Sequence, residues 1–216
     1  MSLTIYLLRH SQSNPRSNLP SEEWPLTEKG QQQSRRLVSV LNSLGIDKVF
    51  SSPYKRCIDT IKPFIESIGR PFTIEQDLHE CHVTHQFLPD PNDFWDIFER
   101  SWNDFTFSYP DGESCRKGQD RIIRLIDRLK SEESGTLLLS SHGNLISLLL
   151  NSLDSGFGFQ ESRQLKNPDL IKITVSDAIS WDKTFDSAKL LGEIFTDQDQ
   201  TPITIEASGH AETRLQ

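Results

Sequence analysis

The interpretation of this 216-residue chain starts from residues 4–13, TIYLLRHSQS. The first half of the stretch is apolar and begins with β-branched residues, a pattern typical of a buried strand. The strand ends abruptly at Arg9 and His10, and the polar run that follows closes at Pro15. In parallel α/β sheets, ligands bind outside the carboxyl ends of the strands. Arg9 and His10 are therefore candidates for chemistry.

The rest of the chain alternates short apolar strands with amphipathic helices. Further strands are predicted at residues 48–50, 72–74, 136–140, 170–175, 178–181 and 189–195. Helices are predicted from Thr27 as N-cap to Leu44, from Ser52 as cap and Pro53 as first helical residue to Gly69, from residues 111–114 to Leu129, and over 145–150. This alternation predicts an α/β domain over residues 1–216, with a largely parallel sheet covered on both faces.

Residues 81–110 interrupt the alternation with a segment that is dense in aromatic side chains. An insertion of this length between a strand and a helix is often a lid or a binding loop. The alternative is a satellite helix over residues 91–105 whose aromatic residues fill a local core. Both interpretations stay open from the sequence, and residues 197–216 form a polar tail of unassigned structure.

The composition limits the binding partners and the cellular compartment that can be expected for this chain. The chain is 35% hydrophobic and 25% charged, which is ordinary for a folded domain, and its net charge of −8 disfavours nucleic acid or an anionic membrane as partner. No apolar run is long enough for a membrane span, and no signal peptide is expected. Three cysteines without CxxC spacing indicate a reducing cytoplasm. A phosphorylated substrate would need positive charge concentrated locally.

Such a concentration is predicted where three strand ends meet. Arg9 and His10 follow the first strand, Arg56 follows the second, and His142 follows residues 136–140. Guanidinium groups match phosphate oxygens, and a neutral imidazole is a competent nucleophile at pH 7. His142 could stabilise charge on the transferred group, with helix N-terminal amides near Gly143 adding donors.

A leaving oxygen also needs a proton. Glu80 follows the third predicted strand, which places a carboxylic acid at the same edge of the sheet. Burial would raise its pKa and the arginines would lower it. His79, Cys81, His82 and His85 surround it, but their spacing matches no standard zinc pattern, and no metal or cofactor is predicted.

The ordered set of these motifs resembles the histidine phosphatase superfamily, in its phosphoglycerate mutase-like branch 1. The resemblance covers about residues 3–150 and rests on residues 8–13, 26–30, 51–56, 78–80, 111–114 and 141–143. It implies a three-layer α/β/α sandwich and no metal requirement. It also implies His10 as the phosphohistidine nucleophile, Glu80 as the proton donor, and Arg9, Arg56 and His142 as phosphate ligands. Gly143, Ser13 and Arg16 are predicted as further contacts to the phosphate or the substrate.

Departures from the family pattern bear on the substrate. Ser11 stands where the family usually has glycine, and Arg16 stands near a usual asparagine. Residues 81–85, CHVTH, replace the glycine and Trp-Glu-Gly residues common in mutase-like members. We therefore expect hydrolysis of a small phosphorylated metabolite. A phosphoglycerate mutase-type transferase and a non-catalytic phospho-ligand binder are the alternatives, and a homodimer stays open.

Overall fold

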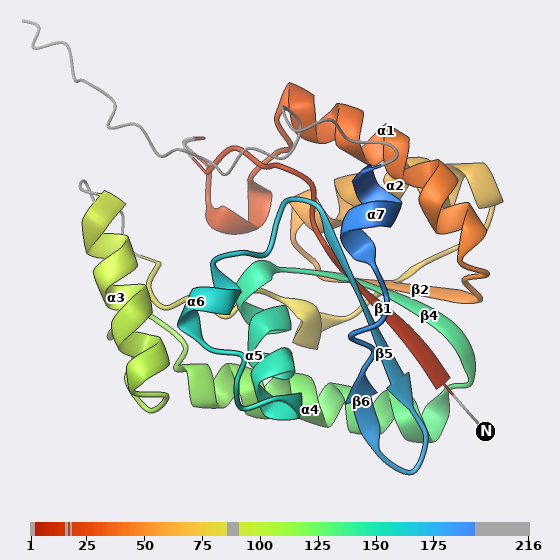
Figure 1. The fold of residues 1–216 in the computed structure, drawn as a ribbon. Helices are drawn as coiled ribbons and strands as arrows, with labels where there is room; N and C mark the ends of the chain where they lie inside the picture. The colour runs from red at the N-terminus through yellow and green to blue at the C-terminus, as the bar shows by residue number, and fades with distance from the viewer. Residues whose placement is uncertain (1–2, 16, 18, 86–90, 193–216) are drawn as a thin grey trace, which may run out of the picture.

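A computed structural model of the chain describes residues 3–15, 17, 19–85 and 91–192, and its centre is a six-stranded sheet (Figure 1). The strand order is β3-β2-β4-β1-β5-β6. The strands are β1 (Leu3–Arg9), β2 (Lys48–Ser51), β3 (Thr73–Ile74), β4 (Gly135–Ser141), β5 (Asp169–Val175) and β6 (Ile179–Trp181). The four strands β3, β2, β4 and β1 are parallel, whereas β5 and β6 add an antiparallel edge. The predicted α/β class with a mostly parallel sheet is confirmed.

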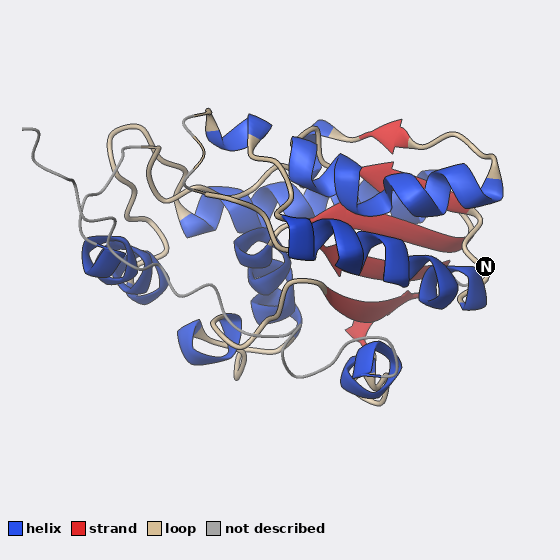
Figure 2. Cartoon of the chain, turned by 90° about the horizontal axis from the view of Figure 1, so that it is seen from above, coloured by secondary structure: helices blue, strands red, loops and turns tan. Residues whose placement is uncertain are grey.

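Two layers of helices cover the sheet (Figure 2). Along β1, Ile5 and Leu7 face one core cluster and Tyr6 and Leu8 the other, as the two-residue period of a strand requires. The first cluster packs against α3 (Pro91–Asn103), α4 (Cys115–Glu132), α5 (Gly143–Leu153) and α6 (Phe159–Ser162). The second packs against α1 (Glu28–Ser43), α2 (Lys55–Ile68) and α7 (Ser187–Gly192). This arrangement is the predicted three-layer sandwich.

The register of the strands brings the polar junctions together. Arg9 pairs with Ser141 of β4 on one side and with Asp169 of β5 on the other. Ser51 of β2 lies opposite Ser140. Residues that directly follow β1, β2 and β4 therefore emerge at one edge of the sheet, and so do the residues that precede β5.

Two element predictions were wrong. The helix after β2 begins at Lys55 and not at Pro53: the Ser52 hydroxyl bonds the His142 ring and accepts from the Tyr54 amide in a turn that precedes the helix. The strand predicted over residues 189–195 is helix α7 where it is described, because Leu191 packs into the core against the sheet. Residues 193–216, and the predicted tail with them, lie outside the described residues.

The aromatic segment contains the predicted satellite helix, α3, preceded by residues 86–90 that lie outside the described part of the chain. Phe98 and Trp102 are each only 9% exposed and belong to the core cluster beneath α4 and α5. The Trp102 indole donates a hydrogen bond to the Asn144 side chain, which ties α3 to α5. Among the described residues, no helix is both long enough and apolar enough to cross a membrane.

Candidate active site

The predicted catalytic residues converge at the carboxyl edge of the sheet. Arg9 ends β1 and His10 follows it, Arg56 lies in the first turn of α2, His142 precedes α5, and Glu80 follows the 3-10 helix η2 (Gln76–Leu78). The rings of His10 and His142 are 5.3 Å apart and edge to face. His10, Arg56 and His142 are 7%, 3% and 0% exposed. The structure therefore gathers all five at one edge of the sheet, with His10, Arg56 and His142 buried and Arg9 and Glu80 half-buried.

His10 is held in one tautomer through both of its ring nitrogens. Its Nδ1 lies 2.7 Å from the carbonyl oxygen of Ser11, which can only accept, so Nδ1 carries the proton. The other nitrogen, Nε2, then holds a lone pair and accepts from Nε of Arg56 at 3.2 Å. Asn167 donates to the His10 carbonyl at 2.7 Å. This tautomer aims the nucleophilic nitrogen at a guanidinium that could carry a phosphate.

Electrostatics keep the His10 imidazole neutral. Burial lowers its pKa well below the ordinary value, and the nearby charges of Arg56 and Arg9 lower it further. The pKa of His142 is lowered for the same reasons, burial first and then Arg56. Both rings therefore stay unprotonated at pH 7, which a nucleophile requires.

Arg56 is fixed from several directions. Its Nη1 donates to the Ser21 carbonyl at 2.6 Å, in the segment that forms the 3-10 helix η1 (Ser21–Glu23). Its guanidinium carbon lies 4.9 Å from the ring centre of Tyr54 and 5.5 Å from that of Trp24. Cation–π contacts of this kind fix the orientation of the planar Arg56 guanidinium.

Arg9 is held with its guanidinium beside the start of α5. The guanidinium donates to the carbonyl oxygen of Leu165, whereas its buried Nε has no hydrogen-bond partner among the described residues. Gly143 makes room for this group, since a Cβ at that position would lie 2.8 Å from the guanidinium carbon of Arg9. Gly143 thus allows Arg9 to pack closely against the start of α5, whereas its predicted contact to phosphate stays a prediction.

The amides at the start of α5 are already engaged. The carboxylate of Glu80 accepts from the Leu145 amide at 3.0 Å, from the Asn144 amide at 3.3 Å and from the Cys81 amide at 2.9 Å. The pKa of Glu80 is raised by burial, against the lowering effect of Arg56 and of these amides. The balance that the sequence left open thus favours an acid that retains its proton to higher pH. The amides of Asn144 and Leu145 therefore donate to Glu80, whereas the sequence analysis suggested that amides near Gly143 donate to phosphate.

His142 is oriented by a side chain that the sequence analysis assigned elsewhere. Its Nε2 lies 2.7 Å from the hydroxyl of Ser52. Ser52 is fully buried, and Tyr54 packs edge to face against the His142 ring at 5.0 Å. The junction after β2 therefore supplies Arg56 and also the two residues that fix His142.

The remaining predicted contacts have mixed outcomes. Ser13 is buried and its backbone bridges to Leu26, which fastens the loop after His10 to the start of the next segment. Arg16 lies outside the described residues. Ser11 is fully buried, its amide donates to Thr60 Oγ1 at 2.8 Å, and its own hydroxyl is buried without a partner among the described residues.

Sequence reasoning missed Asn167, Tyr54, Trp24 and Ser21 as residues of the site. Asn167 precedes Pro168 through a cis peptide bond, just before β5. The Asn-Pro pair signals a turn in the sequence, but nothing in the pattern connects that turn to His10. Among the described residues, no three histidine, cysteine, aspartate or glutamate side chains are grouped as a metal site would need.

The comparison with known proteins defines the class. The model of the histidine phosphatase superfamily (branch 1) matches residues 5–186, so the chain belongs to this superfamily. One relative is "Probable phosphoglycerate mutase GpmB" of Enterobacter sp. (strain 638). It is 27% identical over 191 residues, which cover 82% of this chain and 86% of the relative.

Solved structures show the same fold. The phosphoglycerate mutase from Bacillus anthracis str. Sterne is 21% identical to this chain and has a TM-score of 0.69. The match covers 88% of this chain and 96% of that chain. The native mycobacterial glucosyl-3-phosphoglycerate phosphatase is 22% identical, with a TM-score of 0.66. The match covers 84% of this chain and 96% of that chain. The named neighbours thus include a mutase and a phosphatase.

Proposed function

We propose that this chain is a phosphomonoesterase that transfers the phosphoryl group of a small metabolite to His10 and then to water. The observation that carries the proposal is the lone pair on His10 Nε2, held 3.2 Å from the Arg56 guanidinium in a buried site. An imidazole in this tautomer, facing a phosphate-binding fork, is arranged for attack on phosphorus.

In the first step, Nε2 of His10 attacks phosphorus as the ester oxygen leaves. Arg9 and Arg56 neutralise the non-bridging oxygens, and His142, whose ring lies 5.3 Å from that of His10, is the third phosphate contact. Glu80 gives its proton to the leaving oxygen, which its raised pKa favours. In the second step, the Glu80 carboxylate takes a proton from water as that water attacks the phosphohistidine, which releases phosphate and restores the acid.

The mutase alternative differs only in the acceptor. A mutase returns the phosphoryl group of the phosphohistidine to another hydroxyl, and a relative at 27% identity carries a mutase name. The replacement of the mutase-like residues after Glu80 by residues 81–85 favours hydrolysis.

A reducing cytoplasm suits the proposal, since Cys57, Cys81 and Cys115 are buried free thiols.

The test is a screen of phosphorylated metabolites for phosphate release, joined to acid-labile labelling of the protein by a radioactive substrate. We expect turnover and label in the wild type. In His10→Ala we expect loss of label and a fall in kcat/KM of at least about 10⁴-fold, because the covalent route is removed.

His85→Ala is the matched control, because it removes an imidazole that contacts His82 and leaves the contacts of His10 intact. That variant should still label. Label that persists in His10→Ala would refute the proposal. Isomerised phosphoglycerate without net phosphate release would establish the mutase alternative instead.

A further inference from the structure

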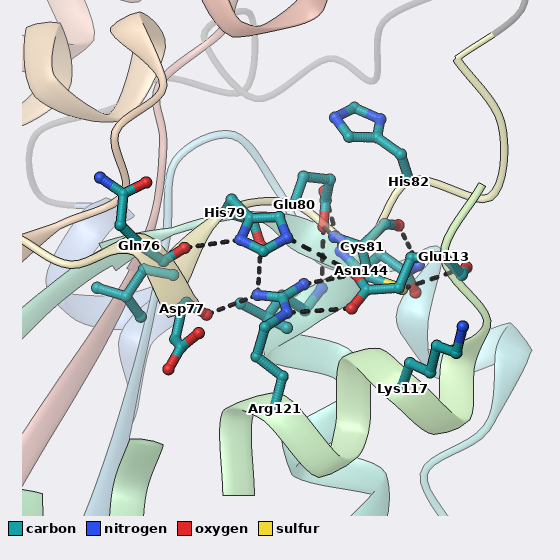
Figure 3. Close-up of polar contacts among 12 residues, drawn as sticks. Gln76, Asp77, His79, Glu80, Cys81, His82, Glu113, Lys117, Arg121 and Asn144 are labelled. Carbon is teal, nitrogen blue, oxygen red and sulfur yellow. Dashed lines mark hydrogen bonds and ion pairs between the residues drawn. The ribbon is translucent and has the colours of Figure 1, made fainter. Parts of the chain in front are cut away.

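The segment that carries Glu80 is held through its main chain. The carbonyl oxygens on both sides of this residue accept hydrogen bonds from α4, from β4 and α5, and from the loop before α4. They belong to Asp77, Leu78, His79, Cys81 and His82. Figure 3 shows Arg121, Glu113 and Asn144 beside this segment. These hydrogen bonds fix the main chain of residues 77–82 on both sides of Glu80, so the geometry of this segment is strongly specified.

Arg121 supplies two of these contacts. It lies on α4, is 7% exposed, and its Nη1 donates to the carbonyls of Asp77 at 2.6 Å and His79 at 3.0 Å. These carbonyls lie on the amino-terminal side of Glu80. The Arg121 guanidinium therefore bridges two carbonyls of the turn that precedes Glu80.

Glu113 fixes the other side of the same guanidinium. Its carboxylate accepts from Nε of Arg121 at 3.1 Å and from Nη2 at 2.6 Å, which is a bidentate pair. Its own amide donates to the His82 carbonyl at 2.7 Å. The Arg121–Glu113 pair thus binds the main chain on both sides of Glu80. Arg121 donates to carbonyls before it, and the Glu113 amide donates to a carbonyl after it.

The remaining anchors come from the sheet and from α5. The Ser141 hydroxyl donates to the Leu78 carbonyl at 2.9 Å, and the Asn144 side chain donates to the Cys81 carbonyl at 2.9 Å. Asn144 also contributes an amide to the Glu80 carboxylate. The loop is therefore positioned relative to the strand that leads to His142.

The chemistry explains why a paired arginine suits this place. A buried guanidinium is costly unless its charge and its donors are satisfied, and Glu113 and the two carbonyls satisfy them. An unpaired cation behind Glu80 would favour the ionised carboxylate, which cannot donate a proton. Pairing with Glu113 allows Arg121 to orient the loop without that effect.

We propose that Arg121 and Glu113 are positioning residues that set the distance between Glu80 and the leaving oxygen. The inference rests on the proposed function, because it concerns the proton donor of that reaction. Neither side chain contacts the phosphate ligands Arg9 and Arg56 in the hydrogen bonds of the described residues. Their loss should therefore affect proton donation and leave phosphate capture intact.

Leaving-group dependence separates this role from a merely structural one. Wild type, Arg121→Met and Arg121→Lys are compared by kcat/KM on p-nitrophenyl phosphate, phenyl phosphate and an alkyl phosphate. We expect Arg121→Met to lose at least about tenfold on the alkyl ester and less than about threefold on the nitrophenyl ester, whose leaving group hardly needs a proton. Arg121→Lys should fall between the wild type and Arg121→Met.

Arg128→Met is the matched control. Arg128 lies on the same helix, is 41% exposed at its side chain, and pairs with the side chains of Glu75 and Glu132. Its loss removes an ion pair but no contact to the carbonyls around Glu80, so the leaving-group dependence should match the wild type.

A double variant makes the test decisive. In a Glu80→Gln background, Arg121→Met should cause no further loss on the alkyl ester, because the group that it positions is gone. Equal losses on all three esters, or an additive loss in the double variant, would overturn the inference. If Arg121→Met fails to fold, Arg121→Lys and Glu113→Gln answer the same question. Failure of the proposed function looks different, since the wild type would then give no phosphohistidine at His10.

Discussion

His10 and Glu80 lie at the same edge of the sheet, yet they are fixed in different ways. His10 is held at its ring, with Nδ1 on the Ser11 carbonyl and Nε2 on Arg56. Glu80 is held through carbonyls on either side of it, and within the described part of the chain its carboxylate accepts only from the amides of Cys81, Asn144 and Leu145.

The difference agrees with the roles that we propose for the two groups. A nucleophile needs one tautomer and one direction of attack, so its ring atoms must be tied individually. A proton donor changes charge within each turnover, and a support that acts on its main chain does not depend on that charge. The two halves of the site should therefore respond to mutation with different signatures.

The largest effect should come from the nucleophile's half. Arg56→Ala removes the donor to His10 Nε2 and one phosphate-binding fork, and we expect kcat/KM to fall about 10³-fold on every ester, independent of leaving group. Steady-state kinetics on nitrophenyl and alkyl phosphates measure this.

Arg56→Lys is the informative partner of this variant. It keeps the charge but loses the planar fork and its packing against Tyr54 and Trp24, so it should recover only part of the activity. A loss confined to the alkyl ester would contradict the assignment of Arg56 to phosphate.

The acid's half should show a smaller and selective effect. Glu80→Gln should lower kcat/KM on an alkyl phosphate about 10²-fold, and on nitrophenyl phosphate much less. In the wild type, the raised pKa of Glu80 keeps the acid protonated to higher pH, and activity on the alkyl ester should fall as the pH rises through that pKa.

The pH profile supplies the control. In Glu80→Gln the descending limb should vanish, whereas the protonation of His10 should limit activity only well below its ordinary pKa. Arg9, Arg56 and Tyr54 also interact with Glu80, but none of them titrates near neutrality. A descending limb that survives in Glu80→Gln would assign proton donation to another group.

The smallest effect should come from a residue that the sequence analysis missed. Asn167→Ala removes the donor to the His10 carbonyl, and we expect a loss of about tenfold in kcat/KM, equal for all esters. This leaving-group independence would place Asn167 in the nucleophile's half. A loss seen only with alkyl esters would move it to the half of Glu80.

The parallel part of the fold and the site within it could be predicted from the sequence. Buried parallel strands are short apolar runs, and the polar residues after them must meet at one edge. His10, Arg56 and His142 were found in this way, and the family resemblance added the roles. The start of the helix after β2 was misplaced by two residues, because residues 53 and 54 form a bend between the strand and the helix.

The antiparallel edge and the long-range side-chain pairs could not be predicted. Asn167 reaches His10 only because β5 runs opposite to β1, and strand direction is not visible in a single apolar run. Arg121 resembles any other basic residue on an amphipathic helix. Its burial against Glu113 depends on how α4 packs beside the Glu80 loop, which is a property of the tertiary structure.

The close approaches at Gly30 and Gly143 have a consequence for how such a molecule can be altered. A side chain at position 30 would meet the carbonyl of Gln12 at 2.0 Å, and one at position 143 would meet the Arg9 guanidinium at 2.8 Å. The last residue of β1 is therefore packed closely against the start of α5, and the loop after β1 against the start of α1. A loop transplanted alone from a relative would arrive without its matching surfaces, so the exchangeable unit is the set of three segments.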